Sequence, residues 1–327
     1  MLGAFLLVQL AAEVALLGWL AHYVAVDQGW GWAAALGLVA LIVVGFDALI
    51  IGITYGISGA ARPHSKERVR IGPFAFLGEL AREVFAYLAC FKVLQPFVLL
   101  TMGPRKRALG PAAGPPVLLV HGYLCNRGMW WHIARRLARR GYRVHTIDLE
   151  PPLGDIDDYG RQLDRRIEEV RDAEGSRAPI LVGHSMGGLV IRACMRARGP
   201  IGVRGVVTLG TPHGGTALAP WGLGVNAHSM RLAGPWLLAL ARGEVAGFPI
   251  PVVSIYSSHD NFVSPPESSR LGGATNVRVI GVGHLAMAFS RRVDEALMEA
   301  LAAIEAKPAA AINAAIEAKR EAAAGLP

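Results

Sequence analysis

The stretch Gly183-His184-Ser185-Met186-Gly187 lies between an apolar run, 179–183, and an amphipathic run, 186–198. These two runs are typical of a buried strand and of a helix that packs on it. A serine in a G-x-S-x-G turn between a strand and a helix has a strained backbone and exposes its hydroxyl at the carboxyl edge of the sheet. The flanking glycines are required because a side chain there would collide with the neighbouring strand or helix. Ser185 is therefore the candidate nucleophile; the alternative is a glycine-rich turn that happens to hold a serine.

The chain from residue 115 onward repeats this alternation of short apolar runs and amphipathic stretches. The alternation predicts a mostly parallel sheet flanked by helices, which is an α/β fold. An apolar insertion at about 212–248 separates two strands and is expected to cap the site, either as an acyl-binding lid or as an ordinary helix packed on the core. The predicted strands are 116–120, 142–148, 179–183, 203–210, 250–256 and 276–281, and the predicted helices are 127–140, 157–174, 186–198 and 285–306.

A serine hydroxyl is a weak nucleophile unless a base accepts its proton and an acid orients that base. Asp260 follows the predicted strand 250–256, and His284 follows the next one, so both loops lie at the carboxyl edge of the sheet with Ser185. The order serine, acid, histidine along the chain is the one that accompanies this strand–turn–helix motif. The alternatives are a turn-forming aspartate and a surface histidine, and Asp148 is the weaker candidate acid.

The tetrahedral intermediate of acyl transfer carries an oxyanion that needs two N–H donors. The N–H of Met186 is one candidate because it directly follows the nucleophile. The N–H of Tyr123 is the other, since it lies on the loop after the first predicted strand, where a glycine lets the backbone approach closely. We interpret the neighbouring His121 and the later His213 as structural residues. This chemistry needs no metal or organic cofactor, and the cysteines have no zinc-type spacing.

Three segments, 120–123, 183–188 and 209–216, together resemble bacterial triacylglycerol lipases and esterases of the α/β-hydrolase superfamily. The resemblance covers about 115–305 and includes the stretches around the candidate acid and histidine. It implies the α/β-hydrolase fold and ester hydrolysis through an acyl-enzyme, with Ser185, Asp260 and His284 as the triad. Secreted lipases carry a signal peptide where this chain has apolar runs, so a membrane lipid or a lipophilic ester is favoured as the substrate.

The N-terminal residues are almost free of charge, and their two apolar runs, 3–26 and about 32–57, are each long enough to cross a bilayer as a helix. The short connector between them predicts a transmembrane hairpin over 1–57. A cleaved signal peptide is the alternative for the first run, although no basic residue precedes it. We expect Glu13 and Asp47 to lie at similar depth, either as a shared-proton or partner-binding pair or as two protonated acids that face the bundle interior.

Nine basic residues lie between 62 and 107 against three acidic ones, which accounts for six of the eight net positive charges. A basic band beside apolar helices fits anionic lipid headgroups, and no nucleic-acid motif accompanies it. The positive charges after the second apolar run predict cytoplasmic ends for the hairpin at the bacterial inner membrane, with a cytoplasmic catalytic domain. Those nearest the run are Arg62, Lys66, Arg68 and Arg70. If 84–101 spans the membrane instead of lying in the interface, the domain moves to the other side.

The domain boundaries follow from these patterns. We expect a transmembrane hairpin over 1–57, basic interfacial helices over 58–114, the α/β-hydrolase domain over 115–306 and an Ala-rich helical tail over 307–327. The three scattered cysteines indicate buried, reduced thiols.

The predicted activity is that of a membrane-anchored serine ester hydrolase, an esterase, lipase or phospholipase. An acyltransferase that uses the same triad and an inactive membrane scaffold are the alternatives. Lipid and bilayer are the expected partners, and the hairpin offers a route to a homo-oligomer.

Overall fold

The computed structural model describes residues 1–61, 69, 71–244 and 248–307 of the chain. A six-stranded sheet in the order β2-β1-β3-β4-β5-β6 forms its centre, and every neighbouring pair of strands is parallel. The strands are β1 (Pro116–Val120), β2 (Arg143–Thr146), β3 (Ile180–His184), β4 (Gly205–Leu209), β5 (Val252–Ser257) and β6 (Thr275–Val279). The six predicted strands are confirmed, with boundaries that differ by one or two residues.

Helices cover both faces of the sheet. Along β1, Val117 and Leu119 pack with α5 and α10, whereas Leu118 and Val120 pack with α6 and α7. Because alternate residues pack on opposite faces, a strand that is buried on both faces has an unbroken apolar run in its sequence. The helices are α5 (Trp131–Arg139), α6 (Ile156–Ala173), α7 (Met186–Arg198) and α10 (Arg291–Glu305). The insertion between β4 and β5 holds η4 (Ala219–Trp221), α8 (Gly224–Ser229) and α9 (Pro235–Arg242).

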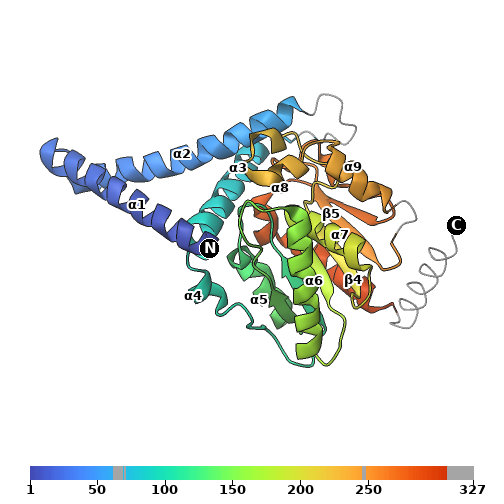
Figure 1. The fold of residues 1–327 in the computed structure, drawn as a ribbon. Helices are drawn as coiled ribbons and strands as arrows, with labels where there is room; N and C mark the ends of the chain where they lie inside the picture. The colour runs from blue at the N-terminus through green and yellow to red at the C-terminus, as the bar shows by residue number, and fades with distance from the viewer. Residues whose placement is uncertain (62–68, 70, 245–247, 308–327) are drawn as a thin grey trace.

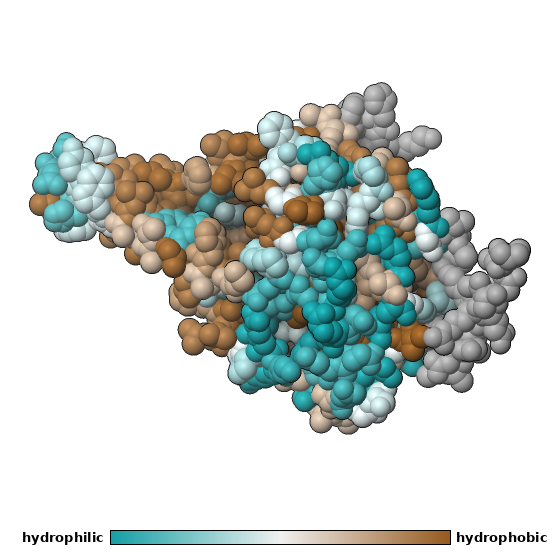
Figure 2. Space-filling view, viewed as in Figure 1, coloured by the Kyte–Doolittle hydropathy of each residue, from teal (hydrophilic) through white to brown (hydrophobic). Residues whose placement is uncertain are grey.

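The N-terminal part of the chain is helical; its first two helices project from the domain, and the later ones pack against it (Figure 1). It consists of α1 (Leu2–His22), η1 (Tyr23–Asp27), α2 (Trp32–Ala60), α3 (Pro73–Leu88), η2 (Ala89–Leu94) and α4 (Val98–Met102). The hairpin helices contact each other near the connector, through Val24, Ala25 and Ala35, and diverge toward the domain. The segments Leu2–Asp27 and Trp32–Ala60 are long and apolar enough to cross a membrane, and only 11% of each apolar window is buried. Figure 2 shows the resulting apolar surface over the projecting helices, beside a hydrophilic surface over the domain.

Helix α3 has its apolar and acidic sides reversed relative to a helix of a water-soluble protein. Phe74, Leu77 and Phe85 are exposed, whereas Glu79 and Glu83 are buried between α2 and the domain. A soluble helix turns its apolar stripe inward, so this reversal fits an outer surface that faces lipid.

The structure corrects two expectations. The single helix expected over 285–306 is broken at Ser290, whose extended backbone ends the 3-10 helix η6 (Leu285–Phe289) before α10 begins. Glu13 does not pair with Asp47; Lys92 donates to both of its carboxylate oxygens, at 2.7 and 2.5 Å. A lysine ammonium neutralises a partly buried carboxylate better than a second acid can, because opposite charges attract.

Several expectations lie outside the described residues. They concern the basic residues Arg62, Lys66, Arg68 and Arg70 and almost all of the Ala-rich tail. The three cysteines, Cys90, Cys125 and Cys194, are described, and each is free and buried, as predicted.

Candidate active site

Ser185 lies in the turn between β3 and α7 with φ 55° and ψ −127°, a strained conformation for a residue with a side chain. Its N–H donates to the Leu209 carbonyl at 2.9 Å, which fixes the turn to the neighbouring strand. The flanking glycines are needed for space. A Cβ at Gly187 would lie 2.2 Å from the Val120 carbonyl oxygen, and one at Gly183 would lie 2.6 Å from the next turn of the chain. This close packing explains why glycines flank the serine in the G-x-S-x-G motif.

Asp260 and His284 meet at the carboxyl edge of the sheet, on the loops after β5 and β6. The His284 Nδ1 and the Asp260 Oδ2 are 2.8 Å apart, and both side chains are buried. The other carboxylate oxygen accepts from the N–H groups of Phe262 and Val263, at 2.8 and 2.7 Å. An imidazole that donates through Nδ1 presents its unprotonated Nε2, the atom that can accept a proton.

Electrostatics favour the protonated form of His284. Burial alone would lower its pKa, but the charge of Asp260 and the hydrogen bond to it outweigh burial and raise the pKa above its usual value. The adjacent His184 behaves oppositely, because burial and the nearby His284 lower its pKa to about 3. His184 therefore stays neutral, and its Nε2 lies 3.1 Å from the His284 carbonyl oxygen. His284 can therefore take up a proton, while the neutral His184 contacts the backbone of His284.

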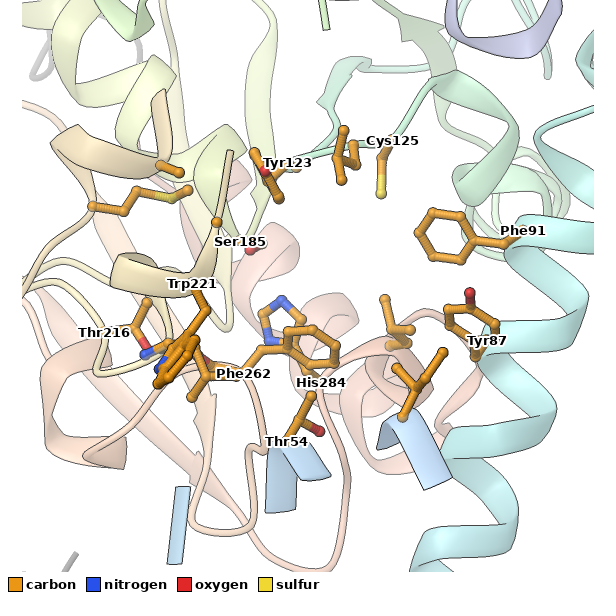
Figure 3. A pocket seen from close by; sticks show the side chains of 18 of the residues that line it. Thr54, Tyr87, Phe91, Tyr123, Cys125, Ser185, Thr216, Trp221, Phe262 and His284 are labelled. Atoms are coloured by element: carbon orange, nitrogen blue, oxygen red, sulfur yellow. Dashed lines mark hydrogen bonds between the residues drawn. The ribbon is translucent and has the colours of Figure 1, made fainter. Parts of the chain in front are cut away.

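Ser185 and His284 line one cavity, and Figure 3 shows both side chains directed into it. Within the described part of the chain, no hydrogen bond joins the two side chains. Contacts of this kind often tighten only when substrate is bound.

The candidate oxyanion donors lie on the two chain segments next to Ser185. Among the described residues, neither the Tyr123 N–H nor the Met186 N–H has a hydrogen-bond acceptor. Gly122 brings the Tyr123 loop close: a Cβ there would lie 2.9 Å from the Ser185 Cβ. The Tyr123 hydroxyl exchanges hydrogen bonds of 2.8 Å with the Leu223 N–H and carbonyl, which ties this loop to the insertion.

The other polar candidates from the sequence have structural contacts. Asp148 is paired with Arg127, so its carboxyl is used away from His284. His121 accepts from the Leu149 N–H at 2.9 Å, and His213 lies 3.1 Å from the Thr208 hydroxyl. Among the described residues, no group of three or more His, Cys, Asp or Glu side chains is placed to hold a metal ion.

Sequence reasoning did not identify the residues of α2 that support the two loops. Asn261 accepts from the His284 N–H at 3.0 Å and donates to the Thr54 hydroxyl at 2.8 Å. Ser58 donates to the Asp260 carbonyl at 3.2 Å and accepts from the Ser264 hydroxyl at 3.0 Å. No local pattern could have linked these residues, because about two hundred positions separate α2 from the loops.

The site cavity has a volume of about 610 Å³ and extends from the domain into the N-terminal helices. Ser185 and His284 lie in its wall together with apolar side chains of the insertion and of α1 and α2. A cavity of this size and polarity is typical of a site for a small apolar molecule.

Comparison with known proteins agrees with the observed fold. The family described as alpha/beta hydrolase fold matches residues 115–223. A stretch of 112 residues, 32% of this chain, is 35% identical to triacylglycerol lipases of Pseudarthrobacter phenanthrenivorans and Burkholderia plantarii, and it covers 35% and 31% of those proteins. A stretch of 105 residues is 33% identical to the pimeloyl-[acyl-carrier protein] methyl ester esterase of Yersinia pestis, over 32% of this chain and 40% of that one.

Among solved structures, the mature lipase BlEst2 of Bacillus licheniformis covers 59% of this chain and 96% of its own, with a TM-score of 0.53 and 22% identity. The predicted α/β-hydrolase fold is confirmed. The chain spans only about a third of the length of the curated lipases, given as 35% and 31%. The family match ends at residue 223, before the loops that hold Asp260 and His284.

We expect Gly187→Ala to lower the free energy of unfolding by about 1–3 kcal/mol, since the new methyl group must displace the backbone of β1. Thermal unfolding in detergent measures the change. Gly272→Ala is the matched control, because no atom lies within 4 Å of a Cβ at that position. Equal melting temperatures for the two variants would contradict this account of the turn.

Asp260→Asn is expected to reduce kcat by about 10⁴-fold. The asparagine no longer holds the proton of His284 on Nδ1, and it lacks the negative charge that stabilises the imidazolium. Because the base must be neutral, kcat/KM of the wild type falls as the pH drops through the raised pKa of His284. Removing the charge of Asp260 lowers that pKa, so the acid limb moves to lower pH. Profiles of kcat/KM against pH, measured with a short p-nitrophenyl ester, test this. Asp148→Asn is the control and is expected to leave the acid limb in place.

Proposed function

We propose that this protein is a membrane-anchored serine hydrolase that cleaves lipophilic carboxylic esters through an acyl-enzyme. The observation that carries the proposal is the buried Asp260–His284 hydrogen bond of 2.8 Å beside the strained Ser185 turn, in the wall of one apolar cavity. A nucleophile, a base and an orienting acid are the groups that acyl transfer requires.

In the first half-reaction the Ser185 Oγ attacks the ester carbonyl carbon, and His284 Nε2 takes up the hydroxyl proton. The carbonyl oxygen becomes an oxyanion that accepts hydrogen bonds from the N–H groups of Tyr123 and Met186. When the intermediate collapses, the ester bond breaks and the alcohol leaves with the proton from His284. The acyl group then remains on Ser185.

In the second half-reaction His284 takes a proton from water, and the resulting hydroxide attacks the acyl carbonyl. Collapse releases the carboxylic acid and returns the proton to Ser185. Asp260 stays ionised throughout and stabilises the imidazolium that forms twice in the cycle. No metal ion or organic cofactor is required by these steps.

The proposed substrate class is supported by the cavity and by the relatives. Most of the lining side chains are apolar, with Leu, Ile and Phe the most frequent, which favours an apolar acyl group over a sugar or peptide. The relatives with shared sequence are named as triacylglycerol lipases and as an esterase of an acyl methyl ester. A phospholipid or lysophospholipid would present the same bond from the membrane.

The proposed anchor is the hairpin α1–α2, whose length and exposed apolar side chains fit a bilayer. Placement in the bacterial inner membrane, with the domain on the cytoplasmic side, rests on the basic residues that follow the hairpin. Anionic headgroups are the partners that these residues fit, and association through the hairpin would give a homo-oligomer.

Hydrolysis of p-nitrophenyl esters of graded chain length and of phospholipids, by detergent-purified protein, tests the proposal. We expect Ser185→Ala to reduce kcat by roughly 10⁶-fold and to abolish labelling by a fluorophosphonate. Ser229→Ala, which removes another buried serine of the insertion, is the matched control and keeps both. Added alcohol or lysolipid reveals acyl transfer as a new ester product. Absence of Ser185-dependent labelling and release would favour an inactive scaffold.

A further inference from the structure

The site cavity is shared between the domain and the hairpin. From α1 it is lined by Phe5 and Leu10, and from α2 by Ile50, Ile53 and Ile57. Positions 50, 53 and 57 are three and four residues apart, so they form one stripe of α2 that faces the cavity. The hairpin therefore supplies a wall of the same space into which Ser185 and His284 project.

This wall is open to the surroundings of the helices. Phe5 is 65% exposed and Ile53 is 52% exposed, although both line the cavity. The opening follows from the shape of the hairpin, because α1 and α2 meet only near their connector and diverge toward the domain. Exposed apolar side chains on both helices make this opening unfavourable in water and favourable in hydrocarbon.

The cavity also has a polar end. Glu13 and Lys92, which are joined by hydrogen bonds of 2.7 and 2.5 Å, both line it. Glu13 lies eleven positions beyond Leu2 on α1, which corresponds to about 16 Å along the helix. An apolar chain that runs along α1 from Leu2 toward Glu13 meets a charged pair, which disfavours further extension.

We propose that the groove between α1 and α2 is the binding site for the acyl chain of the substrate, which enters sideways from the bilayer and reaches Ser185 without crossing water. This inference rests on the proposed function and deepens it, because it makes the membrane helices themselves part of the substrate site. The insertion lines the same cavity through residues that include Trp221 and Met230. An ester already in the membrane is then the natural substrate, and the hairpin helices determine which acyl-chain lengths are accepted.

Ile53→Trp tests the groove by filling it. We expect kcat/KM for p-nitrophenyl dodecanoate to fall at least about tenfold, while that for the butanoate ester changes little. Leu49→Trp is the matched control, since Leu49 is 60% exposed on the same helix and does not line the cavity. Equal losses on both esters, or equal effects of the two variants, would overturn the proposal.

A second readout is independent of hydrolysis. A fatty acid with a photoreactive group on its chain is added to the Ser185→Ala protein in detergent, and the adducts are mapped by peptide mass spectrometry. Adducts on Phe5, Ile50 or Ile53 are expected. Adducts spread equally over outward residues such as Leu49 would reject the groove even if the protein cleaved no ester.

A different observation concerns Glu83 of α3, which is 0% exposed. Its two carboxylate oxygens accept from the N–H groups of Leu285 and Ala286, at 2.8 and 2.9 Å, directly after His284. The approach depends on Gly283, where a Cβ would lie 2.3 Å from the nearer oxygen. Among the described residues, the titratable groups that interact with Glu83 are Tyr55 of α2, Cys90 of η2, and Asp260 and His284 of the domain. Glu79 of α3 accepts a hydrogen bond from the same Tyr55 hydroxyl.

The geometry points to Glu83 as a positioning residue that holds the His284 loop from the N-terminal module. Its position also has an electrostatic consequence. Burial raises the pKa of Glu83 to about 7, and the ionised form of Glu83 contributes to the raised pKa of His284. The N-terminal module thereby influences both the place and the basicity of the proposed catalytic base.

Glu83→Gln retains the shape of the side chain and removes its charge. We expect the acid limb of kcat/KM to move to lower pH, because His284 loses a neighbouring negative charge. Glu79→Gln is the control, since it removes the other buried carboxylate of α3 and is expected to leave the limb in place. A lower rate with an unmoved limb in Glu83→Gln, or an equal shift in both variants, would overturn the role. Melting curves of both variants confirm that each is folded.

Discussion

The hydrogen bond between Asp260 and His284 joins a carboxylate and an imidazole in a place where water is nearly excluded. Burial of a charge is costly unless its remaining polar atoms have partners. The surrounding structure supplies those partners: Phe262 and Val263 donate to the carboxylate, and Asn261 accepts from the His284 backbone. The two loops, α2 and α3 are placed so that the Asp260–His284 pair stays hydrogen-bonded and shielded from water.

The N-terminal helices face two different environments. Their outer surfaces are apolar, whereas their inner surfaces carry Thr54, Ser58 and Glu83, which bond to the loops of Asp260 and His284. A simple anchor would need only the outer surface, since a linker of any structure can tether a domain. The inner hydrogen bonds instead attach the helices to the loops of the candidate site, so the hairpin, the cavity and the two loops form one structural unit.

Parts of the site could be predicted because their requirements are local. The turn at Ser185 needs glycines within two positions, and the loops of Asp260 and His284 directly follow apolar strands, so each leaves a short signature. Other parts leave none. In the sequence, Glu83 has the pattern of a surface charge on an amphipathic helix, and Lys92 interrupts an apolar segment. Their roles arise only because Gly283 and Glu13, far away in the chain, approach them.

The α/β fold, the six strands and the candidate nucleophile, acid and base could be predicted from the amino-acid sequence, because strand patterns and a tight turn are encoded by neighbouring residues. The same is true of the two N-terminal segments that are long and apolar enough to span a bilayer. That these segments line the cavity of Ser185, and that α3 holds the loop of His284, became known from the three-dimensional structure alone. Packing between distant segments depends on shape and on the pairing of charges, and local sequence patterns contain neither.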